Sequence, residues 1–234
     1  MIIQNLKSIG QEGSVKHFVA IRFNLDRGKG CHLDSDWING RLLLLKNECA
    51  NSLSLQTCKD FQVIVLIHKD TSEKTASDIV KTFKDIRLDC HILRATNLLS
   101  ASIAMSKFLS QFDSVISSRI DTDDRYSKYY IQKVQSFLCN IDDEETICVD
   151  FKKIIYKSQS KVNIYNYPAT TMFLSIRSRD PLKHCFFEQH DLIKTRKVKV
   201  IRIDDIGGMI NIHYDNIMNI MRGVPCKIDL SRFF

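Results

Sequence analysis

Three carboxylates crowd into one short turn of this chain, and their spacing suits the binding of a cation. Asp121, Asp123 and Asp124 occur in "SVISSRIDTDDRYSKYYI", behind an apolar run and ahead of a helical pattern. Oxygen ligands two or three residues apart in a turn can converge on a hard divalent cation such as Mg²⁺ or Mn²⁺. Such a cation would offset the repulsion between the carboxylates and could bridge to a diphosphate. The alternative is a solvated acidic turn that caps a helix from Ser127.

The setting of this cluster distinguishes it from an isolated Asp-x-Asp pair. A second copy of the pattern, Asp34 and Asp36, lies in a polar segment before a helical pattern, where helix capping accounts for it. The copy at residues 121–124 instead ends an apolar run, has a third carboxylate and follows Arg119. These differences favour a binding site over a capping turn.

The segments before the cluster alternate between strands and helices. Strands are predicted over residues 17–25, 61–67, 88–93 and 114–120, and helices over residues 38–53, 76–83 and 99–112. This alternation is typical of an α/β protein with a mostly parallel central sheet flanked by helices. In such sheets ligands bind beyond the carboxyl ends of the strands, where residues 22–24, Asp70 and the cluster lie.

After a predicted helix over residues 129–139, the pattern changes to short strands that we expect to be partly antiparallel. They cover residues 145–151, 152–157, 161–167, 171–177 and 198–203, and a helix is predicted near residues 185–194. Nothing in the composition marks a linker, so we expect one domain over residues 1–234. Residues 17–140 would form its nucleotide-binding half, and residues 141–234 a smaller, mixed acceptor-binding half.

Composition constrains the location of the protein. Hydrophobic residues make up 44% of the 234 residues and charged residues 26%, as in soluble globular proteins. No apolar run approaches the length of a membrane span, the first residues lack a signal-peptide pattern, and the eight cysteines form no CxxC pair. We therefore expect a cytoplasmic protein with reduced thiols.

The net charge of +7 is partly concentrated in "IKTRKVKVIR", residues 193–202. A basic surface could face nucleic acid, anionic lipid or phosphorylated substrates, and a solvated strand flank is an equally good interpretation. Clustered aspartates would repel a phosphate backbone, and zinc-finger and RNP-type motifs are missing, so no nucleic acid partner is expected. If the acceptor is lipid-linked, residues 193–202 could make a peripheral contact with the inner face of the membrane.

Four segments, in this order, resemble one family of enzymes. They are "HFVAIRFNL", "W…R…LLLLKNECANSLSLQTCKDFQVIVLIHKDT", "SSRIDTDDRYSKYYIQKVQ" and "IHYDNIMN". The chain resembles glycosyltransferases of the GT-A fold, and more narrowly the rhamnosyltransferase family, whose Arg-Leu-Asp-x-Asp-Asp core appears here with Ile120 in place of Leu. The C-terminal half matches more weakly, because the family's His-Gly before a late Asn is replaced by His213 and Tyr214.

The resemblance implies that the cluster holds a metal and a sugar nucleotide. Asp123 would bind the metal, Mn²⁺ or Mg²⁺. Asp121 would contact the ribose or a metal-bound water, and Asp124 would orient the sugar or support the metal. His213, after the apolar run "GGMINIHY", is a second candidate metal ligand because imidazole suits Mn²⁺, and the two glycines of that run would allow a flexible loop beside it. A surface or capping histidine is the alternative.

The same resemblance implies further contacts with the donor. Arg22 and Asn24 would line the nucleotide pocket, and Asp70 would read the base or the ribose. Arg119 would offset the charge of the diphosphate, and Arg41 could reach in from the first helix. The expected partners are a dTDP- or UDP-sugar donor and a glycan or lipid-linked saccharide acceptor.

Transfer with inversion requires a carboxylate that takes the proton of the acceptor hydroxyl. The segment "FFEQHDLI" offers Asp191, which is preferred because many GT-A enzymes place their base at such a helix start, and Glu188 as the second choice. Acidic residues favoured by a helix N-terminus are the alternative interpretation. Trp37 and the pair Phe186 and Phe187 could stack on an acceptor sugar or be core residues.

The expected function is an inverting, metal-dependent glycosyltransferase that acts on a surface polysaccharide or another glycan. L-rhamnose carried on dTDP is suggested as the donor sugar by resemblance alone. A nucleotidyltransferase or phosphatase using the same turn is the alternative. However, an aspartyl-phosphate enzyme would place its nucleophile after the first strand, where Arg22 and Asn24 stand, and no Gly-rich phosphate loop is found. A basic nucleic-acid-binding module is least favoured.

Overall fold

The computed structural model describes residues 15–26, 28, 30–139, 146–159, 161–187, 193, 198–213 and 220–234. Its strands are β1 (Lys16–Arg22), β2 (Gln62–His68), β3 (Cys90–Ala95), β4 (Val115–Asp121), β5 (Arg125–Tyr126), β6 (Ile147–Ser158), β7 (Lys161–Asn166), β8 (Leu174–Ser178), β9 (Lys199–Asn211) and β10 (Val224–Pro225). Its helices are η1 (Cys31–Leu33), α1 (Ser35–Leu44), η2 (Leu45–Ala50), α2 (Asn51–Ser54), α3 (Glu73–Asp85), α4 (Leu98–Leu109), α5 (Tyr130–Leu138) and η4 (Leu230–Arg232).

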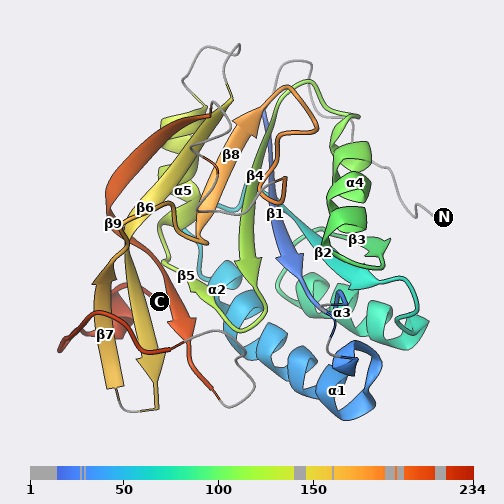
Figure 1. Cartoon of the computed structure of the whole chain (residues 1–234), viewed down its shortest axis with the longest axis horizontal. Helices are drawn as coiled ribbons and strands as arrows, with labels where there is room; N and C mark the ends of the chain where they lie inside the picture. The colour runs from blue at the N-terminus through green and yellow to red at the C-terminus, as the bar shows by residue number, and fades with distance from the viewer. Residues whose placement is uncertain are drawn as a thin grey trace.

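The first half of the chain forms the parallel sheet that the sequence predicts. Strands β3, β2, β1 and β4 lie side by side in this order and are parallel. Strand β8 is antiparallel to β4 and continues the sheet to β6, β7 and β10, while β9 pairs with β6 and with the short β5 (Figure 1). The predicted α/β class with a mixed C-terminal part is therefore confirmed.

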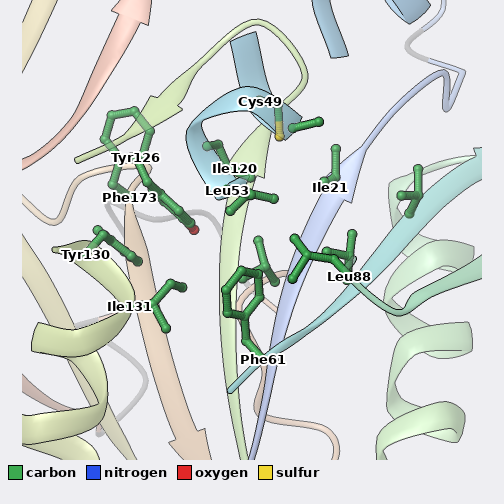
Figure 2. Packing of buried hydrophobic residues seen from close by; sticks show 14 of the residues in the cluster. Ile21, Cys49, Leu53, Phe61, Leu88, Ile120, Tyr126, Tyr130, Ile131 and Phe173 are labelled. Carbon is green, nitrogen blue, oxygen red and sulfur yellow. The ribbon is translucent and has the colours of Figure 1, made fainter. Parts of the chain in front are cut away.

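Helices cover both faces of this sheet, which explains why its central strands are apolar along their whole length. On β1, Val19 and Ile21 belong to an apolar cluster with residues of η2, α2, α3 and α5. Phe18 and Ala20 point to the other face and join a second cluster with α4. Figure 2 shows part of the first cluster, with Cys49 of η2 and Leu53 of α2 beside Ile120 of β4.

Two strands in the second half of the sheet, β6 and β9, are longer than the sequence predicts. The separate strands expected at residues 145–151 and 152–157 are one strand, β6, with an irregular register near Phe151 where it pairs with β9. Strand β9 continues well past residue 203, to Asn211. β6 is antiparallel to β7 and β8, so the expected antiparallel part is confirmed.

The flexible loop expected at Gly207 and Gly208 is wrong, because both glycines lie inside β9. A Cβ atom at Gly207 would lie 2.6 Å from the Cβ of Phe151, and one at Gly208 would lie 2.6 Å from the carbonyl oxygen of Arg125. These glycines therefore allow close packing of β9 against its neighbours rather than motion.

Two other expectations concern helices. Residues 185–187 of the helix predicted near 185–194 form a turn after β8, and most of the remainder lies outside the described residues. Among the described helices, none is both long enough and apolar enough to span a membrane.

Candidate active site

The carboxyl ends of β1 and β4 bring the first two charged residues of the site together. Arg22 and Asp121 are direct partners in the register of these parallel strands. The Arg22 Nη2 atom lies 2.7 Å from Asp121 Oδ2, and both side chains keep part of their surface exposed. The pairing follows from the strand order, because β1 and β4 are neighbours although 99 residues separate the two side chains in sequence.

Asp123 lies at the centre of the site, in the turn between β4 and β5. Arg41 of α1 approaches its carboxylate, with Nη1 at 3.4 Å from Oδ2. His213, just after β9, places its Nε2 atom 3.0 Å from the same oxygen. Three segments that are far apart in sequence therefore meet at one carboxylate. Arg41 thus reaches in from α1, and His213, the second candidate metal ligand, lies beside Asp123, while their roles in binding stay predictions.

The charges around Asp123 keep its carboxylate ionised. Burial by itself would raise the pKa of Asp123, but the hydrogen bond with His213 and the charge of Arg41 outweigh burial and lower the pKa to about 2. A carboxylate that stays charged over the whole physiological range is suited to binding cations.

Asp124 behaves differently because it is buried, with 2% of its surface exposed. Burial raises its pKa well above the usual range, and the negative charges of Asp123 and Asp121 raise it further. Its Oδ1 atom has no hydrogen-bond partner among the described residues. Buried carboxylate oxygens usually have partners, so within the described part of the chain this atom is an exception.

The structure argues against the helix-capping alternative for the turn. Helix α5 begins at Tyr130, its N-cap is Tyr129, and no side chain caps it. Strand β5 separates the turn from this helix. By contrast, Asp34 does cap α1 and accepts a hydrogen bond from the backbone N–H of Trp37 at 2.9 Å, as expected for the second Asp-x-Asp copy.

A small pocket opens beside the turn, and Arg119 lines it. Its other lining residues are Ile120, Asp121, Asp124, Met172 and Phe173. The guanidinium carbon of Arg119 lies 4.8 Å from the centre of the Phe186 ring, and burial lowers the pKa of Arg119. The pocket therefore combines one cation with two of the three clustered carboxylates.

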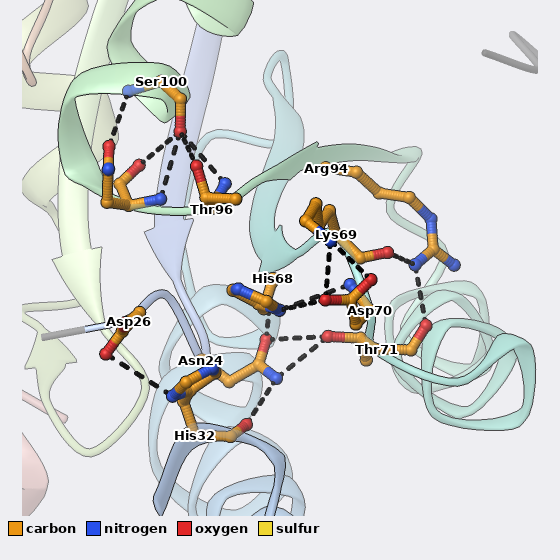
Figure 3. A network of polar contacts seen from close by, with 11 residues as sticks. Asn24, Asp26, His32, His68, Lys69, Asp70, Thr71, Arg94, Thr96 and Ser100 are labelled. Atoms are coloured by element: carbon orange, nitrogen blue, oxygen red, sulfur yellow. Dashed lines mark hydrogen bonds and ion pairs between the residues drawn. The ribbon is translucent and has the colours of Figure 1, made fainter. Parts of the chain in front are cut away.

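Asn24 and Asp70 lie in a separate polar network at the ends of β1 and β2 (Figure 3). The Asn24 amide donates to the backbone carbonyl of His32 and to Thr71 Oγ1, both at 2.9 Å, and accepts from the backbone N–H of His68 at 2.9 Å. Asp70 is exposed and accepts from Lys69 Nζ at 2.8 Å. Direct contact of Asn24 or Asp70 with a nucleotide stays a prediction.

The aromatic residues considered for an acceptor occupy different environments. Phe186 is buried in the apolar cluster beneath α4, and Phe187 packs against that cluster. Trp37 lies partly exposed on α1, where the Arg41 guanidinium carbon is 5.6 Å from the centre of its ring. Trp37 is therefore linked to the site through Arg41, and Phe186 through Arg119.

Several predicted features fall outside the described residues. They include both candidate bases, Glu188 and Asp191, and residues 194–197 of the basic segment. Arg202, which was expected to add to a basic surface, instead turns inward. Its Nε atom donates to the fully buried Asp150 at 3.0 Å, and Nη2 donates to the carbonyl of Tyr167 at 2.7 Å. Arg202 thus anchors the loop before β8 and does not form part of a basic face.

The described residues at the turn can supply only some of the ligands that a divalent cation needs. Within the described ranges, no group of three or more His, Cys, Asp and Glu side chains converges as a cation site. Asp123 and His213 do converge, and Asp124 presents the unpartnered Oδ1 atom. Mg²⁺ and similar ions are commonly bound by one or two carboxylates together with phosphate oxygens of the substrate. The residues present are compatible with that mode of binding.

The sequence over residues 21–220 matches the family described as "Putative rhamnosyl transferase". The chain belongs to this family. This is a family of glycosyltransferases, as the resemblance implied. No curated protein sequence matches it.

Solved structures show the fold of this glycosyltransferase. It is similar to S. aureus TarS residues 1–349 in complex with UDP-GlcNAc (TM-score 0.52, 14% identity, 86% of this chain and 60% of that one). It is also similar to the mannosyltransferase PcManGT from Pyrobaculum calidifontis in complex with GDP-Man and Mn²⁺ (TM-score 0.52, 12% identity, 86% and 58%). A third match is the inositol-1-phosphate CTP transferase from T. maritima (TM-score 0.50, 11% identity, 85% and 89%).

These likenesses identify the GT-A fold. The chain spans about 60% of the length of the first two structures.

The site has three residues that the sequence reasoning missed. Glu48 of η2 accepts from Arg125 Nε at 2.6 Å and from Asn211 Nδ2 at 2.8 Å. Asn211 also donates to the backbone carbonyl of Asp123 at 2.7 Å. Arg125 could have been noticed because it directly follows the cluster, but nothing in the sequence links Glu48 or Asn211 to it.

Proposed function

We propose that this protein is an inverting, metal-dependent glycosyltransferase that takes its sugar from a nucleotide donor. Our preferred donor is dTDP-L-rhamnose, with UDP-sugars second, and the acceptor is a glycan, such as a surface polysaccharide or a lipid-linked saccharide. The observation that supports this best is the aspartate turn. There Asp123 lies between Arg41 and His213, and Asp124 has a buried oxygen without a hydrogen-bond partner in the described part of the chain.

Asp123 and His213 would hold a divalent cation, Mn²⁺ or Mg²⁺, with Asp124 supporting it. When bound, such a cation supplies positive charge for the diphosphate of the donor. PcManGT, which shares the fold, was crystallised with GDP-Man and Mn²⁺, and this supports the choice of cation.

The protein's own residues would orient the donor. Asp121, fixed by Arg22, is exposed enough to accept hydrogen bonds from ribose hydroxyls. Arg119, at the wall of the pocket, would neutralise charge on the leaving diphosphate. Asn24 and Asp70 would shape the part of the site that receives the base. These roles assign donor binding to the half that ends near residue 140 and acceptor binding to the half that follows.

The acceptor hydroxyl must lose a proton as the new bond forms. We assign this proton to Asp191, with Glu188 as the second choice, because a carboxylate within hydrogen-bond reach of the hydroxyl can act as general base. If the acceptor is lipid-linked, residues 193–202 without Arg202 would be the segment that contacts the membrane.

Calorimetry with dTDP, UDP, GDP and CDP tests the proposal, each with and without Mn²⁺. We expect one nucleotide to bind in a Mn²⁺-dependent manner and Asp123→Ala to weaken that binding by about a hundredfold or more, since this variant removes the central cation ligand. Failure of folded wild-type protein to bind any of the four would contradict the proposal. Metal-dependent turnover of nucleoside triphosphates instead would favour the nucleotidyltransferase alternative.

A further inference from the structure

The carboxylate of Glu48 lies close to the aspartate turn without belonging to it. Its Oε2 atom accepts from Arg125 Nε at 2.6 Å and from Asn211 Nδ2 at 2.8 Å. Asn211 in turn donates to the carbonyl oxygen of Asp123 at 2.7 Å. One carboxylate oxygen thus connects the helical segment α1–η2–α2 to β5 and to β9, on either side of the turn.

We propose that Glu48 is a positioning residue for the sugar-nucleotide site. It holds Asn211 against the backbone of Asp123 and thereby sets the distance between the Asp123 carboxylate and His213. This inference rests on the proposed function, because it assigns Glu48 to the site where cation and nucleotide would bind.

The geometry of Asn211 shows why an acceptor is needed at Glu48. The Nδ2 atom of Asn211 contacts the Glu48 carboxylate and the Asp123 carbonyl, which are both acceptors. Only the NH₂ side of the amide, with its two donors, can satisfy both contacts at once. Glu48 therefore fixes which way the amide faces.

Asn211 and His213 act on the same residue from the same end of β9. Asn211 binds the backbone of Asp123, while the imidazole of His213 lies 3.0 Å from the side chain of Asp123. A shift of Asn211 would move His213 with it, because only one residue separates the two. Loss of the Glu48 contact should therefore be felt at the cation ligands, although Glu48 touches neither side chain.

The local backbone explains how Glu48 comes to face the strands. Residues 45–50 form a π-helical turn between α1 and α2, which widens the helix at this point. The next residue, Cys49, is fully buried in the apolar cluster, and its environment includes the charge of Asp124. The buried Cys49 anchors the π-helical turn beneath the aspartates, and the partly exposed Glu48 reaches β5 and β9. Such turns occur frequently at functional sites.

Two substitutions and a matched control test this role. Glu48→Ala removes both acceptor contacts, whereas Glu48→Gln keeps one oxygen for Asn211 but loses the charge that faces Arg125. Asp205→Ala is the control, since Asp205 forms an ion pair that also ties β9 to a helix, through Lys133 of α5, but away from the turn.

The measurement is calorimetric binding of dTDP with saturating Mn²⁺, or of UDP, GDP or CDP if wild type binds that nucleotide instead. We expect Glu48→Ala to bind about 10 to 100 times more weakly and Glu48→Gln about 3 to 10 times more weakly, as for residues that orient metal ligands. Asp205→Ala should remain within about twofold of wild type. The Mn²⁺ concentration for half-saturation should rise in the same order.

A purely structural role would change the melting temperatures without this order in binding. Wild-type affinity in folded Glu48→Ala, or an equal loss in Asp205→Ala, would overturn the inference. If Glu48→Ala does not fold, Glu48→Gln decides: wild-type affinity in that variant overturns the role of Glu48. If wild type binds no nucleotide, the proposed function and this inference both fall. If wild type and variants all bind a nucleotide equally well, only this inference falls.

Discussion

Two polar regions at the carboxyl edge of the same sheet are built in opposite ways. Around Asn24, at the ends of β1 and β2, both polar atoms of the amide side chain are paired within the protein (Figure 3). Around Asp123, at the end of β4, three carboxylates crowd together, and Asp124 keeps a buried oxygen without a partner among the described residues. Among the described residues, the first region satisfies its own hydrogen bonds, and the second leaves one buried oxygen unsatisfied.

The physical cost of each arrangement explains the difference. A hydrogen-bonded amide in the interior stabilises the fold modestly. A buried amide that loses its partners destabilises the fold by more than that. Neighbouring carboxylates repel each other in the folded protein. The pKa of Asp124 is raised mainly by its burial and further by this repulsion. Strain of this kind at the end of a strand is typical of binding and catalytic sites. The comparison can be tested by removing groups from each kind of region.

The largest effect on stability is expected for Asn24→Ala. The substitution leaves the His68 N–H and the His32 carbonyl without their partner in a region with almost no solvent, which should lower the free energy of unfolding by about 2 to 3 kcal/mol. Urea denaturation followed by circular dichroism measures this change. An Asn24→Ala protein as stable as wild type would show that the network is not self-sufficient and would break the comparison.

A smaller, pH-dependent effect on stability is expected from His17. It belongs to another self-contained polar group, at the amino ends of the parallel strands. Its Nε2 atom is 2.8 Å from Ser118 Oγ, and burial lowers the pKa of His17 to about 3. Because the unfolded chain binds this proton near pH 6.5, the unfolded state binds more protons than the folded state below that pH, and stability falls as the pH falls.

For His17, the predicted loss between about pH 6.5 and about pH 5 is about 1.5 kcal/mol, from the unfolded pKa and the linkage relation. Urea titrations at both pH values, on wild type and on His17→Gln, isolate this contribution. The variant should lose less stability over the interval than wild type does. Parallel curves for the two proteins would mean that His17 is not held neutral.

The smallest effect on stability is expected for Asp70→Ala, which sharpens the comparison at the exposed side of the Asn24 network. Asp70 is exposed, and the hydrogen bond from Lys69 lowers the pKa of its carboxyl. Exposed pairs of this kind contribute little, so the melting temperature should not change measurably. If Asp70 reads the base or the ribose, binding of the preferred nucleotide should weaken about ten- to a hundredfold, as for loss of one hydrogen bond to a charged group. Unchanged binding would remove Asp70 from the site.

Most of the fold could be predicted from the sequence because burial leaves a periodic signal. The strand–helix alternation up to residue 121 follows from apolar runs and helical spacing, and the structure confirms it. The lengths of β6 and β9 could not be predicted, since polar residues such as Lys152 and Lys153 interrupt the apolar pattern where the strand simply runs along the surface. Glycines were misread for a related reason: sequence shows that Gly207 has no side chain, but not that Phe151 occupies the space.

The sequence by itself determined the aspartate turn, because three adjacent carboxylates after an apolar strand form a local pattern that carries its own chemistry. It also determined the family, since matching segments keep their order along the chain. Only the tertiary structure decided that Glu48 and Asn211 also reach the turn, because η2 and β9 pack around the end of β4. These contacts cannot be predicted from the sequence, since hydrogen bonds and ion pairs between residues far apart along the chain depend on the path of the folded backbone.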